Sequence, residues 1–404
     1  MNAFKRKSVG LAVAAALSLS TAHAQVSDNL IKIGVLTDMS SLYTDLSGAG
    51  SVAAAKLAVE DSGIEKRGYK VEVINADHQN KPDVGSAIAR QWYDVDKVDV
   101  IVDTPNSGVA LAVNQITRDK GKAFLVSGAA SSDLTGKACS PNTIHWTYDT
   151  WMLANGTGSA IVKTGGDSWF FITADYAFGH ALERDTEANV LKNGGKVLGK
   201  VRVPLNNQDF SSFLLQAQAS KAKIIGLANA GGDTTNSIKQ AAEFGIVKGG
   251  QSLAGMLVFL TDIKSLGLPT AQGLIFTETF YWDMNDQTRA FAKRFAAADK
   301  GIHPTMIHAG VYSAVTHYLK AVEALKGDDG TKVIAKMKET PTDDPLFGKG
   351  TIRADGRKIH PAYLVEAKKP SESKGEWDLY KIRATIPADQ AFRPLKDGDC
   401  PLVK

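Results

Sequence analysis

The chain has 404 residues, of which 44% are hydrophobic and 22% charged, a composition typical of a soluble globular protein with room for two domains. Its 47 basic and 43 acidic residues give a formal net charge of +4, and three of the basic residues, Lys5, Arg6 and Lys7, lie at the N-terminus. The rest of the chain is therefore close to neutral, which gives no reason to expect nucleic acid or an anionic membrane as a partner.

Residues 1–24 have the pattern of a removable export signal. The basic start leads into the apolar run 9–19, and the small residues of Ala22-His23-Ala24 stand two apart, as a cleavage site requires. The sequence predicts cleavage after Ala24 and a mature protein in a bacterial periplasm; the alternative is a buried N-terminal helix. The apolar run is too short for an anchor, and no later segment reaches ~18 apolar residues, so we expect no membrane span. No cofactor is expected, since ATP and NAD belong to the cytoplasm.

Short apolar strands then alternate with amphipathic helices. The expected strands are 31–36, 71–74, 98–102, 123–126, 169–172, 196–203 and 223–228. The expected helices are 47–62, 82–96, 108–119, 151–164, 178–193, 210–219 and 234–244. This alternation predicts an α/β protein whose parallel sheet structure is covered by helices on both faces.

The final third of the chain changes character. We expect a strand over 273–280, helices over 286–299, 305–325 and 330–338, and a β-hairpin over 348–367 that turns at Ala354-Asp355-Gly356-Arg357. No low-complexity linker separates the halves, which suggests that the chain crosses between two domains several times through short hinges.

Three loops after expected strands combine small polar residues with the start of a helix. They are 104–108 with Asn106 and Ser107, 127–132 with Ala129, Ala130 and Ser131, and 229–233 with Asn229. Ligands of doubly wound sheets bind beyond the carboxyl ends of the strands, and free N–H groups at a helix start suit a carboxylate. The alternative is that these residues only cap their own helices. Two such loops on successive strands favour a binding site.

Aromatic residues occur in the matching loops. Tyr43, Tyr148, Tyr176 and Phe280 each follow an expected strand or lie at the expected hinge, and together they can enclose a flat or apolar ligand; the alternative is that they are core residues. The sequence shows no nucleophile–base–acid set and no metal-ligand spacing, so we expect neither catalysis nor a metal site.

Cys139 and Cys400 are the only two cysteines. An exported protein can form a disulfide, and this one would fasten the C-terminal tail to the first lobe; the alternative is two unpaired thiols. Neither cysteine has the surroundings of a reactive thiol.

The opening Ile31-Lys32-Ile33-Gly34-Val35-Leu36-Thr37-Asp38, with Tyr43 and Gly48 after it, resembles the start of type I periplasmic binding proteins of the Leu/Ile/Val-binding group. Further similar stretches are Asp103 to Val109, Val126 to Ala130 with Leu134-Thr135, and Asp175-Tyr176-Ala177-Phe178-Gly179. The resemblance covers nearly the whole mature chain. No single motif is specific, but the order and spacing of the motifs together are. It implies two Rossmann-like doubly wound lobes, joined by three hinge crossovers, that close on a small carboxylate solute and deliver it to an inner-membrane ABC permease.

The resemblance also implies a domain organisation. The N-terminal lobe would comprise 25–145 and 277–354, and the C-terminal lobe 146–276 and 355–385. The tail 386–404 would pack back on the N-terminal lobe. Hinges are expected near 145–148, 274–278 and 352–360, and the protein is expected to be a monomer.

Carried over by position, the resemblance places Ser107 and the backbone around Ala129, Ala130 and Ser131 at the ligand carboxylate. Tyr43, Tyr148 and Tyr176 would line the cleft, and Asn229 and Phe280 would approach from the second lobe.

One departure from the family pattern matters for the ligand. Amino-acid binders of this family place a carboxylate after the strand that matches 253–258, where it pairs with the ligand ammonium, but here Phe259 and Leu260 stand in that region. An unpaired buried ammonium is costly, so either Asp262, Asp175 or Glu278 substitutes or the ligand has no amine. We expect an amino acid or related small carboxylate; an aromatic acid of the benzoate or cinnamate type, or a short amide, is the alternative. A ligand-sensing module of a signalling system is the alternative of another class.

Overall fold

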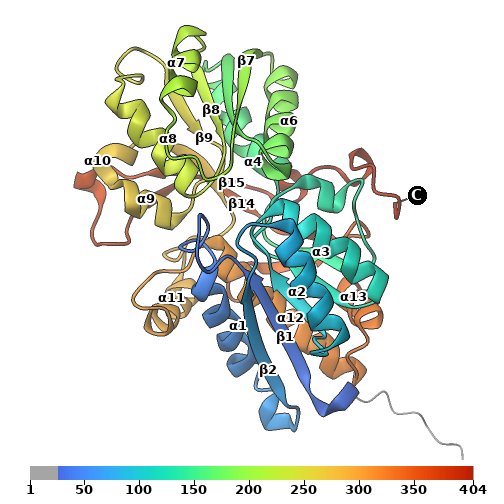
Figure 1. Ribbon diagram of the computed structural model, residues 1–404. Coiled ribbons are helices and arrows are strands. Elements are labelled where there is room, and N and C mark those ends of the chain that lie inside the picture. The colour runs from blue at the N-terminus through green and yellow to red at the C-terminus, as the bar shows by residue number, and fades with distance from the viewer. Residues whose placement is uncertain (1–25, 404) are drawn as a thin grey trace, which may run out of the picture.

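Two parallel β-sheets form the centres of two lobes, which lie one above the other in Figure 1. This computed structural model describes residues 26–403. The predicted export signal, 1–24, and its cleavage site lie outside the described residues. Over 26–403, no helix combines the length and the apolar character needed to cross a bilayer.

The first lobe has a five-stranded parallel sheet in the order β2-β1-β3-β4-β5. Its strands are β1 (Ile31–Thr37), β2 (Val71–Asp77), β3 (Val100–Asp103), β4 (Ala123–Val126) and β5 (Thr143–His145). The helices on one face are α1 (Gly48–Ser62), α11 (Asp286–Ala298), α12 (Met306–Leu325) and α13 (Gly330–Glu339), and those on the other are α2 (Pro82–Asp94) and α3 (Ser107–Lys120). Successive side chains of a strand point to opposite faces, and accordingly Val100 and Val102 join the core under α1 and α12, whereas Ile101 joins the core under α2 and α3.

The second lobe repeats this plan with four parallel strands in the order β7-β6-β8-β9. They are β6 (Ser168–Ala174), β7 (Lys196–Val203), β8 (Ile224–Ala228) and β9 (Ser252–Gly255). One face carries α6 (Ala177–Lys192) and the helical segment α4 (Thr150–Leu153), π-helix Ala154–Gly158 and α5 (Ser159–Lys163); the other carries α7 (Ser211–Ala219), α8 (Gly232–Glu243), α9 (Leu260–Leu266) and α10 (Leu268–Ala271). Neighbouring residues of β6 again face separate cores, with Phe171 on the α6 side and Phe170 on the other.

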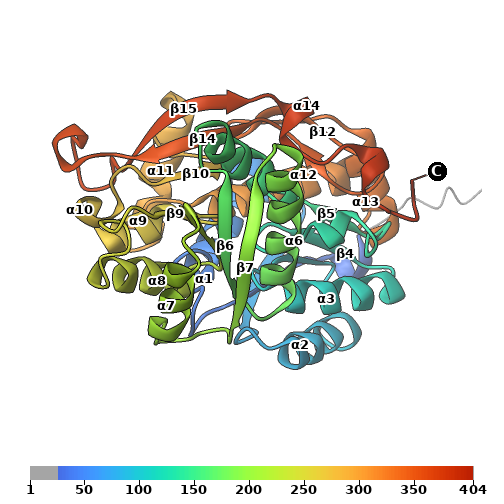
Figure 2. The same ribbon diagram turned by 90° about the horizontal axis from the view of Figure 1, so that it is seen from above.

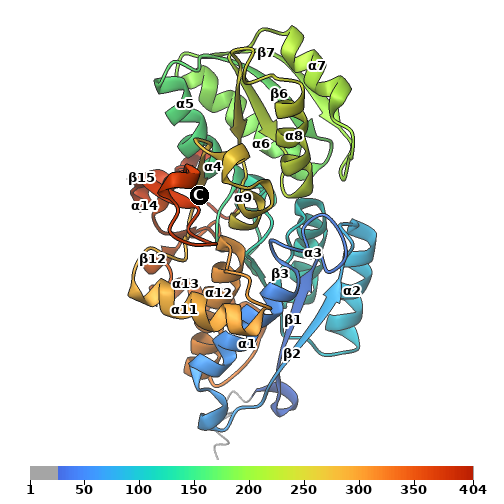
Figure 3. The same ribbon diagram turned by 90° about the vertical axis from the view of Figure 1, so that its left-hand side faces the viewer.

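A third, antiparallel sheet lies at the junction between the lobes (Figures 2 and 3). Strand β10 (Ile275–Glu278) pairs with β14 (Ala362–Ala367), which pairs with β15 (Tyr380–Ile386). The chain leaves the first lobe after β5, returns to it after β10 with α11, and leaves it again before β14. These three passages join two doubly wound α/β lobes, as the sequence predicted.

The stretch 348–367 is not the single hairpin that the sequence predicted. Strand β12 (Gly348–Ile352) pairs with the two-residue strand β13 (Lys358–Ile359), and also with β11 (Thr342–Asp344). The turn lies where it was expected, with φ of 84° at Gly356, a value that glycine adopts without strain. Pro361 then follows β13; since proline has no N–H for a ladder, it separates β13 from β14, which pairs in the junction sheet instead.

Cys139 and Cys400, the two cysteines expected to pair, form a disulfide with a Cα–Cα distance of 5.7 Å. The bridge joins positions 261 residues apart in the sequence. It holds the C-terminal tail, with α14 (Ala388–Ala391) and the 3-10 turn Leu395–Asp397, beside the loop that follows β4.

Candidate binding site between the lobes

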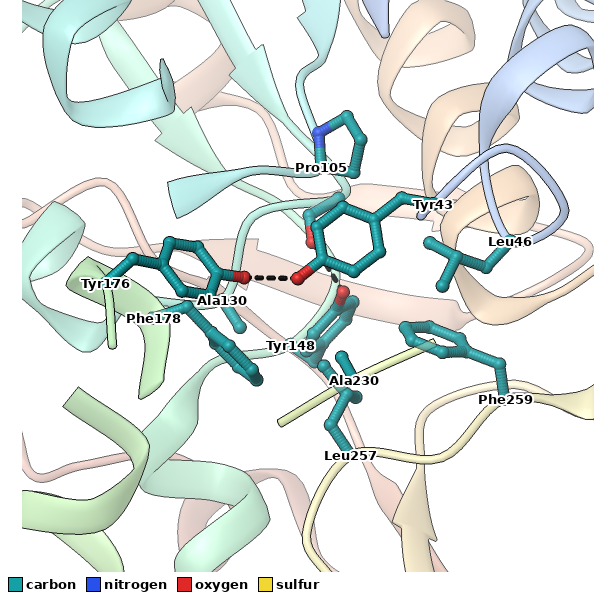
Figure 4. Close-up of a pocket in the computed structure, with 11 residues that line it drawn as sticks. Tyr43, Leu46, Pro105, Ala130, Tyr148, Tyr176, Phe178, Ala230, Leu257 and Phe259 are labelled. Carbon is teal, nitrogen blue, oxygen red and sulfur yellow. Dashed lines mark hydrogen bonds between the residues drawn. The ribbon is translucent and has the colours of Figure 1, made fainter. Parts of the chain in front are cut away.

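A pocket lies between the lobes, at the carboxyl ends of strands from both sheets (Figure 4). The space between its walls is about 230 Å³, including its opening to solvent. The lining residues are mostly aromatic or small: Tyr43, Leu46, Pro105, Gly128, Ala130, Tyr148, Tyr176, Phe178, Ala230, Leu257 and Phe259. Both lobes contribute to this wall, so the structure is in a closed form.

Close backbone contact between the lobes accompanies this closure. The loop after β1 reaches the start of α8, where a Cβ on Gly231 would lie 2.9 Å from the carbonyl oxygen of Leu42. Gly231 also has φ of 58°, in the region that favours glycine. Only a residue without a side chain allows this approach.

The expected carboxylate-binding residues of the first lobe come together at the ends of β3 and β4. The Ser107 hydroxyl oxygen accepts from the N–H of Ala130 at 3.3 Å and of Ser131 at 3.1 Å. Ala130 lines the pocket, with Ala129 and Ser131 beside it in sequence. Ser107 is fully buried behind this loop, so its hydroxyl holds the two amides in place.

Asn106 serves its own helix. Its side-chain oxygen accepts from the N–H groups of Gly108 at 2.9 Å and Val109 at 3.1 Å, as an N-cap of α3 does. It does not line the pocket in the described structure.

Three tyrosine hydroxyls lie near the centre of the pocket (Figure 4). The hydroxyl oxygens of Tyr43, from the first lobe, and Tyr176, from the second, are hydrogen bonded at 2.5 Å. The Tyr148 hydroxyl donates to the Gly128 carbonyl at 2.5 Å. Burial raises the pKa of all three phenols above the usual value, so they remain neutral at physiological pH and can donate hydrogen bonds.

The other expected residues of the second lobe and the junction lie away from the lining. Asn229 is buried and accepts from the Thr234 hydroxyl at 2.7 Å within the start of α8. Asp175 is about half exposed and pairs with His180 at 2.8 Å. Phe280 packs against Phe291 in the core of the first lobe.

Several lining residues were not predicted as site residues from the sequence. Leu257 and Phe259 come from the loop between β9 and α9, and Ala230 stands beside the expected Asn229. Phe259 contacts Tyr148 edge to face with ring centroids 6.0 Å apart. Phe178, the second residue of α6, also lines the pocket; from the sequence it is one of the aromatic residues that follow an expected strand and can enclose a ligand.

Several buried carboxyls surround the pocket without lining it, among them Asp103, Asp233, Asp262 and Glu278. Asp262 accepts from the backbone N–H of Phe259 at 2.9 Å, and Glu278 accepts from the Tyr380 hydroxyl at 3.4 Å. Burial raises the pKa of Asp262 to about 7, and burial together with the charge of Asp262 raises the pKa of Glu278 well above its usual value. The second Glu278 oxygen has no hydrogen-bond partner among the described residues. No basic side chain of the described residues is paired with either acid.

Within residues 26–403, no three His, Cys, Asp or Glu side chains are grouped as they are in a metal site. The pocket therefore offers aromatic surface, phenol hydroxyls and backbone amides, which are groups that bind and orient a small molecule. A pocket between two doubly wound lobes is the arrangement of a two-lobed solute-binding protein, as the resemblance implied.

Residues 30–376 match the family model described as "Periplasmic binding protein". The chain belongs to this family. It is a type I periplasmic binding protein and is similar to Leu/Ile/Val-binding protein homologues. A periplasmic binding protein from Burkholderia mallei is 51% identical, with a TM-score of 0.91 over 93% of this chain and 100% of that one.

Two other solved structures are informative. A branched-chain amino acid ABC transporter periplasmic ligand-binding protein from Burkholderia xenovorans LB400 is 44% identical, with a TM-score of 0.82 over 93% of this chain and 100% of that one. An ABC transporter solute-binding protein from R. palustris, in complex with benzoate, is 23% identical, with a TM-score of 0.79 over 89% of this chain and 97% of that one. The relation to the R. palustris protein is one of fold.

Proposed function

We propose that this protein is the periplasmic receptor of an ABC importer and captures a small carboxylate by closing its two lobes. The family supports a receptor that works with a membrane permease, and the pattern of residues 1–24 supports export with cleavage after Ala24. Solute contacts from both lobes stabilise the closed form over the open one, so the permease can distinguish loaded from empty receptor.

The solute carboxylate would lie at the loop after β4. There the N–H groups of Ala130 and Ser131 donate to the buried Ser107 oxygen, which does not line the described pocket. A carboxylate at the Ala130 wall would share these N–H groups with Ser107 and accept from its hydroxyl. We propose a small solute, of the size of leucine or benzoate, because a protein of the same fold was solved in complex with benzoate.

The observation that carries the proposed solute class is the absence of an acid from the described pocket wall. The carboxylate of the solute would bind backbone amides and phenol hydroxyls. The rest of the solute would contact the aromatic rings of Tyr148, Phe178 and Phe259. An ammonium placed there would lose its hydration without a carboxylate in return. We propose a monocarboxylate without an amine, and with an aromatic or branched apolar body.

An amino acid is the second candidate, and the buried pair Asp262 and Glu278 favours it. Asp262 accepts from the backbone of Phe259, and both acids are close enough to Tyr148 to raise its pKa. Neither acid has a basic partner among the described residues. If Phe259 moved, the ammonium of an amino acid could reach these two acids and become the cation that pairs with them.

Titration calorimetry with matched solutes tests these two candidates. Leucine and 4-methylpentanoate differ only in the amine, and benzoate and benzamide differ in the carboxylate. We expect 4-methylpentanoate to bind at least as tightly as leucine, and benzoate to bind more tightly than benzamide. Tighter binding of leucine would favour the amino-acid candidate, and equal binding of benzamide and benzoate would contradict the carboxylate site.

Replacing Ser107 with alanine is expected to weaken carboxylate binding by about 1–2 kcal/mol. The change removes a donor to the carboxylate and the acceptor that holds the amides of Ala130 and Ser131. Because two buried N–H groups lose their acceptor, we also expect the melting temperature to fall. Calorimetry and thermal unfolding measure the two effects. Ser140→Ala is the matched control, since Ser140 is buried and accepts only from Asn142 N–H at 3.2 Å; unchanged affinity in Ser107→Ala would remove Ser107 from the site.

The phenol pair of Tyr43 and Tyr176 is expected to stabilise the closed form by one hydrogen bond, about 1 kcal/mol. Tyr43→Phe and Tyr176→Phe should each weaken solute binding about fivefold. The double variant should be no weaker than either single variant, because each removes the same bond. Tyr318→Phe is the control, since its buried hydroxyl has no partner among the described residues. Additive losses would mean that the two hydroxyls bind the solute separately.

A further inference from the structure

The C-terminal tail contacts both lobes and the junction between them. The Asn155 side chain, in the π-helical segment of the second lobe, donates to the Gln390 carbonyl at 2.9 Å. The Phe392 ring is buried at the junction, 4.4 Å from the Arg357 guanidinium carbon and 5.2 Å from the His360 ring. The tail therefore lies along the back of the cleft.

The next tail residue, Arg393, holds the loop that contains the proposed carboxylate site. Its guanidinium donates to the Ser132 carbonyl at 3.0 Å, and its own carbonyl accepts from Arg353 at 2.7 Å. Ser132 directly follows Ala130 and Ser131. The position of Ser132 thus limits where these two amides can lie.

Ser132 is also held from the second lobe. Its N–H donates to the Thr150 hydroxyl at 3.1 Å, and its hydroxyl donates to Asp185 at 2.6 Å and accepts from Arg184 at 2.8 Å. Ser132 and Asp185 are both buried, so the bonds to Thr150 and Asp185 are shielded from water, whereas Arg184 is half exposed. Without Arg393, the segment would stay tied to the second lobe, but the Ser132 carbonyl would lose its donor from the tail.

The disulfide fixes the other end of the same contact. Cys400 is bonded to Cys139, and a Cβ on Gly136 would lie 2.7 Å from the Gly398 carbonyl oxygen. The tail is therefore bound to both ends of the segment 132–139, to Ser132 through Arg393 and to Cys139 through the disulfide.

We propose that Arg393 and the disulfide-held tail are positioning elements of the solute-binding loop. They act from outside the pocket, by fixing Ser132 and with it the amides of Ala130 and Ser131. The inference rests on the proposed function in one respect, that these amides bind the solute.

Arg393→Ala tests the proposal by two separate measurements. Amide hydrogen exchange at Ala130, Ser131 and Ser132 should become faster by roughly tenfold, and affinity for the tighter of benzoate and 4-methylpentanoate should fall roughly threefold to tenfold, which is the worth of one hydrogen bond. Arg393→Lys retains one donor, so its amide exchange and its affinity should both be close to those of the wild type. Arg383→Ala is the matched control, since Arg383 is a half-exposed residue of β15 that pairs with Glu366.

Unchanged exchange at the three amides in Arg393→Ala would overturn the proposal, and so would equal loss in Arg393→Lys and Arg393→Ala. Cys139→Ser with Cys400→Ser provides a second variant, and it should speed exchange at the same amides if Arg393→Ala does not fold. If the wild type binds neither benzoate nor 4-methylpentanoate, the proposed solute class is wrong, whereas the exchange measurement still decides the role of the tail.

Discussion

Replacing Cys139 and Cys400 together with serine is expected to lower the free energy of unfolding by about 2–5 kcal/mol. The disulfide joins positions 261 residues apart, so it removes much of the freedom of the unfolded chain. Both cysteines are buried, and the serine hydroxyls that replace them would need new partners. Urea unfolding of the oxidised wild type and of the double variant measures the difference.

The wild type measured with dithiothreitol is the control for this prediction. Reduction removes the bond without changing side-chain polarity by much, so reduced wild type should lose most of the same stability. If oxidised and reduced wild type unfold at the same urea concentration while two free thiols can be titrated in the reduced protein, the disulfide contributes nothing to stability and the prediction is wrong.

Asp262→Asn is expected to make stability less dependent on pH. The pKa of Asp262 is about 7 in the folded protein, against about 3.9 in an unfolded chain, so the folded state binds the extra proton between these values. The stability from this proton is fully present below about pH 4 and is lost as the pH rises through 7. Asparagine does not titrate and can still accept from Phe259 N–H. Relative to wild type, the variant should therefore gain roughly 3–4 kcal/mol of unfolding free energy between pH 4 and pH 8.

Urea unfolding of wild type and variant at pH 4, 6 and 8 measures this change. Asp343→Asn is the matched control, because Asp343 lies exposed on β11, and it should show the wild-type pH dependence. A difference between Asp262→Asn and wild type that is the same at all three pH values would show that Asp262 is ionised throughout, with a cation or water as its partner.

Much of the fold could be predicted because the strands of parallel sheets are buried on both faces and therefore appear as apolar runs. Strand 123–126, which is buried along its whole length, has the expected bounds. The edge strand 196–203 also has the expected bounds, although it is only partly buried. Strand β15 was not predicted, since Tyr380–Ile386 is mostly exposed and alternates charged residues with apolar ones at the edge of its sheet. Helix α9 was not predicted because it is short and begins at a hydrophobic residue, with Asp262 as its capping side chain.

The meeting of the loops after β3 and β4 could be predicted from the sequence. Ser107 and Ala130 follow neighbouring strands, so their meeting follows from the order of the parallel sheet. The contribution of Leu257 and Phe259 depends on the path of an irregular loop and on how the two lobes meet, which no local pattern in the sequence specifies. Phe280 has the same aromatic character as the lining residues, and only packing shows that it belongs to the core.

Small-angle X-ray scattering of the full-length mature protein, with and without a saturating monocarboxylate, tests the central claim most directly. The claim is that two hinged lobes close on a small carboxylate, with contacts such as Tyr43 to Tyr176 made only in the closed form. We expect benzoate or 4-methylpentanoate to reduce the radius of gyration and to bring the scattering curve to that of the closed structure. An unchanged scattering curve with a carboxylate that calorimetry shows to be bound would contradict this account.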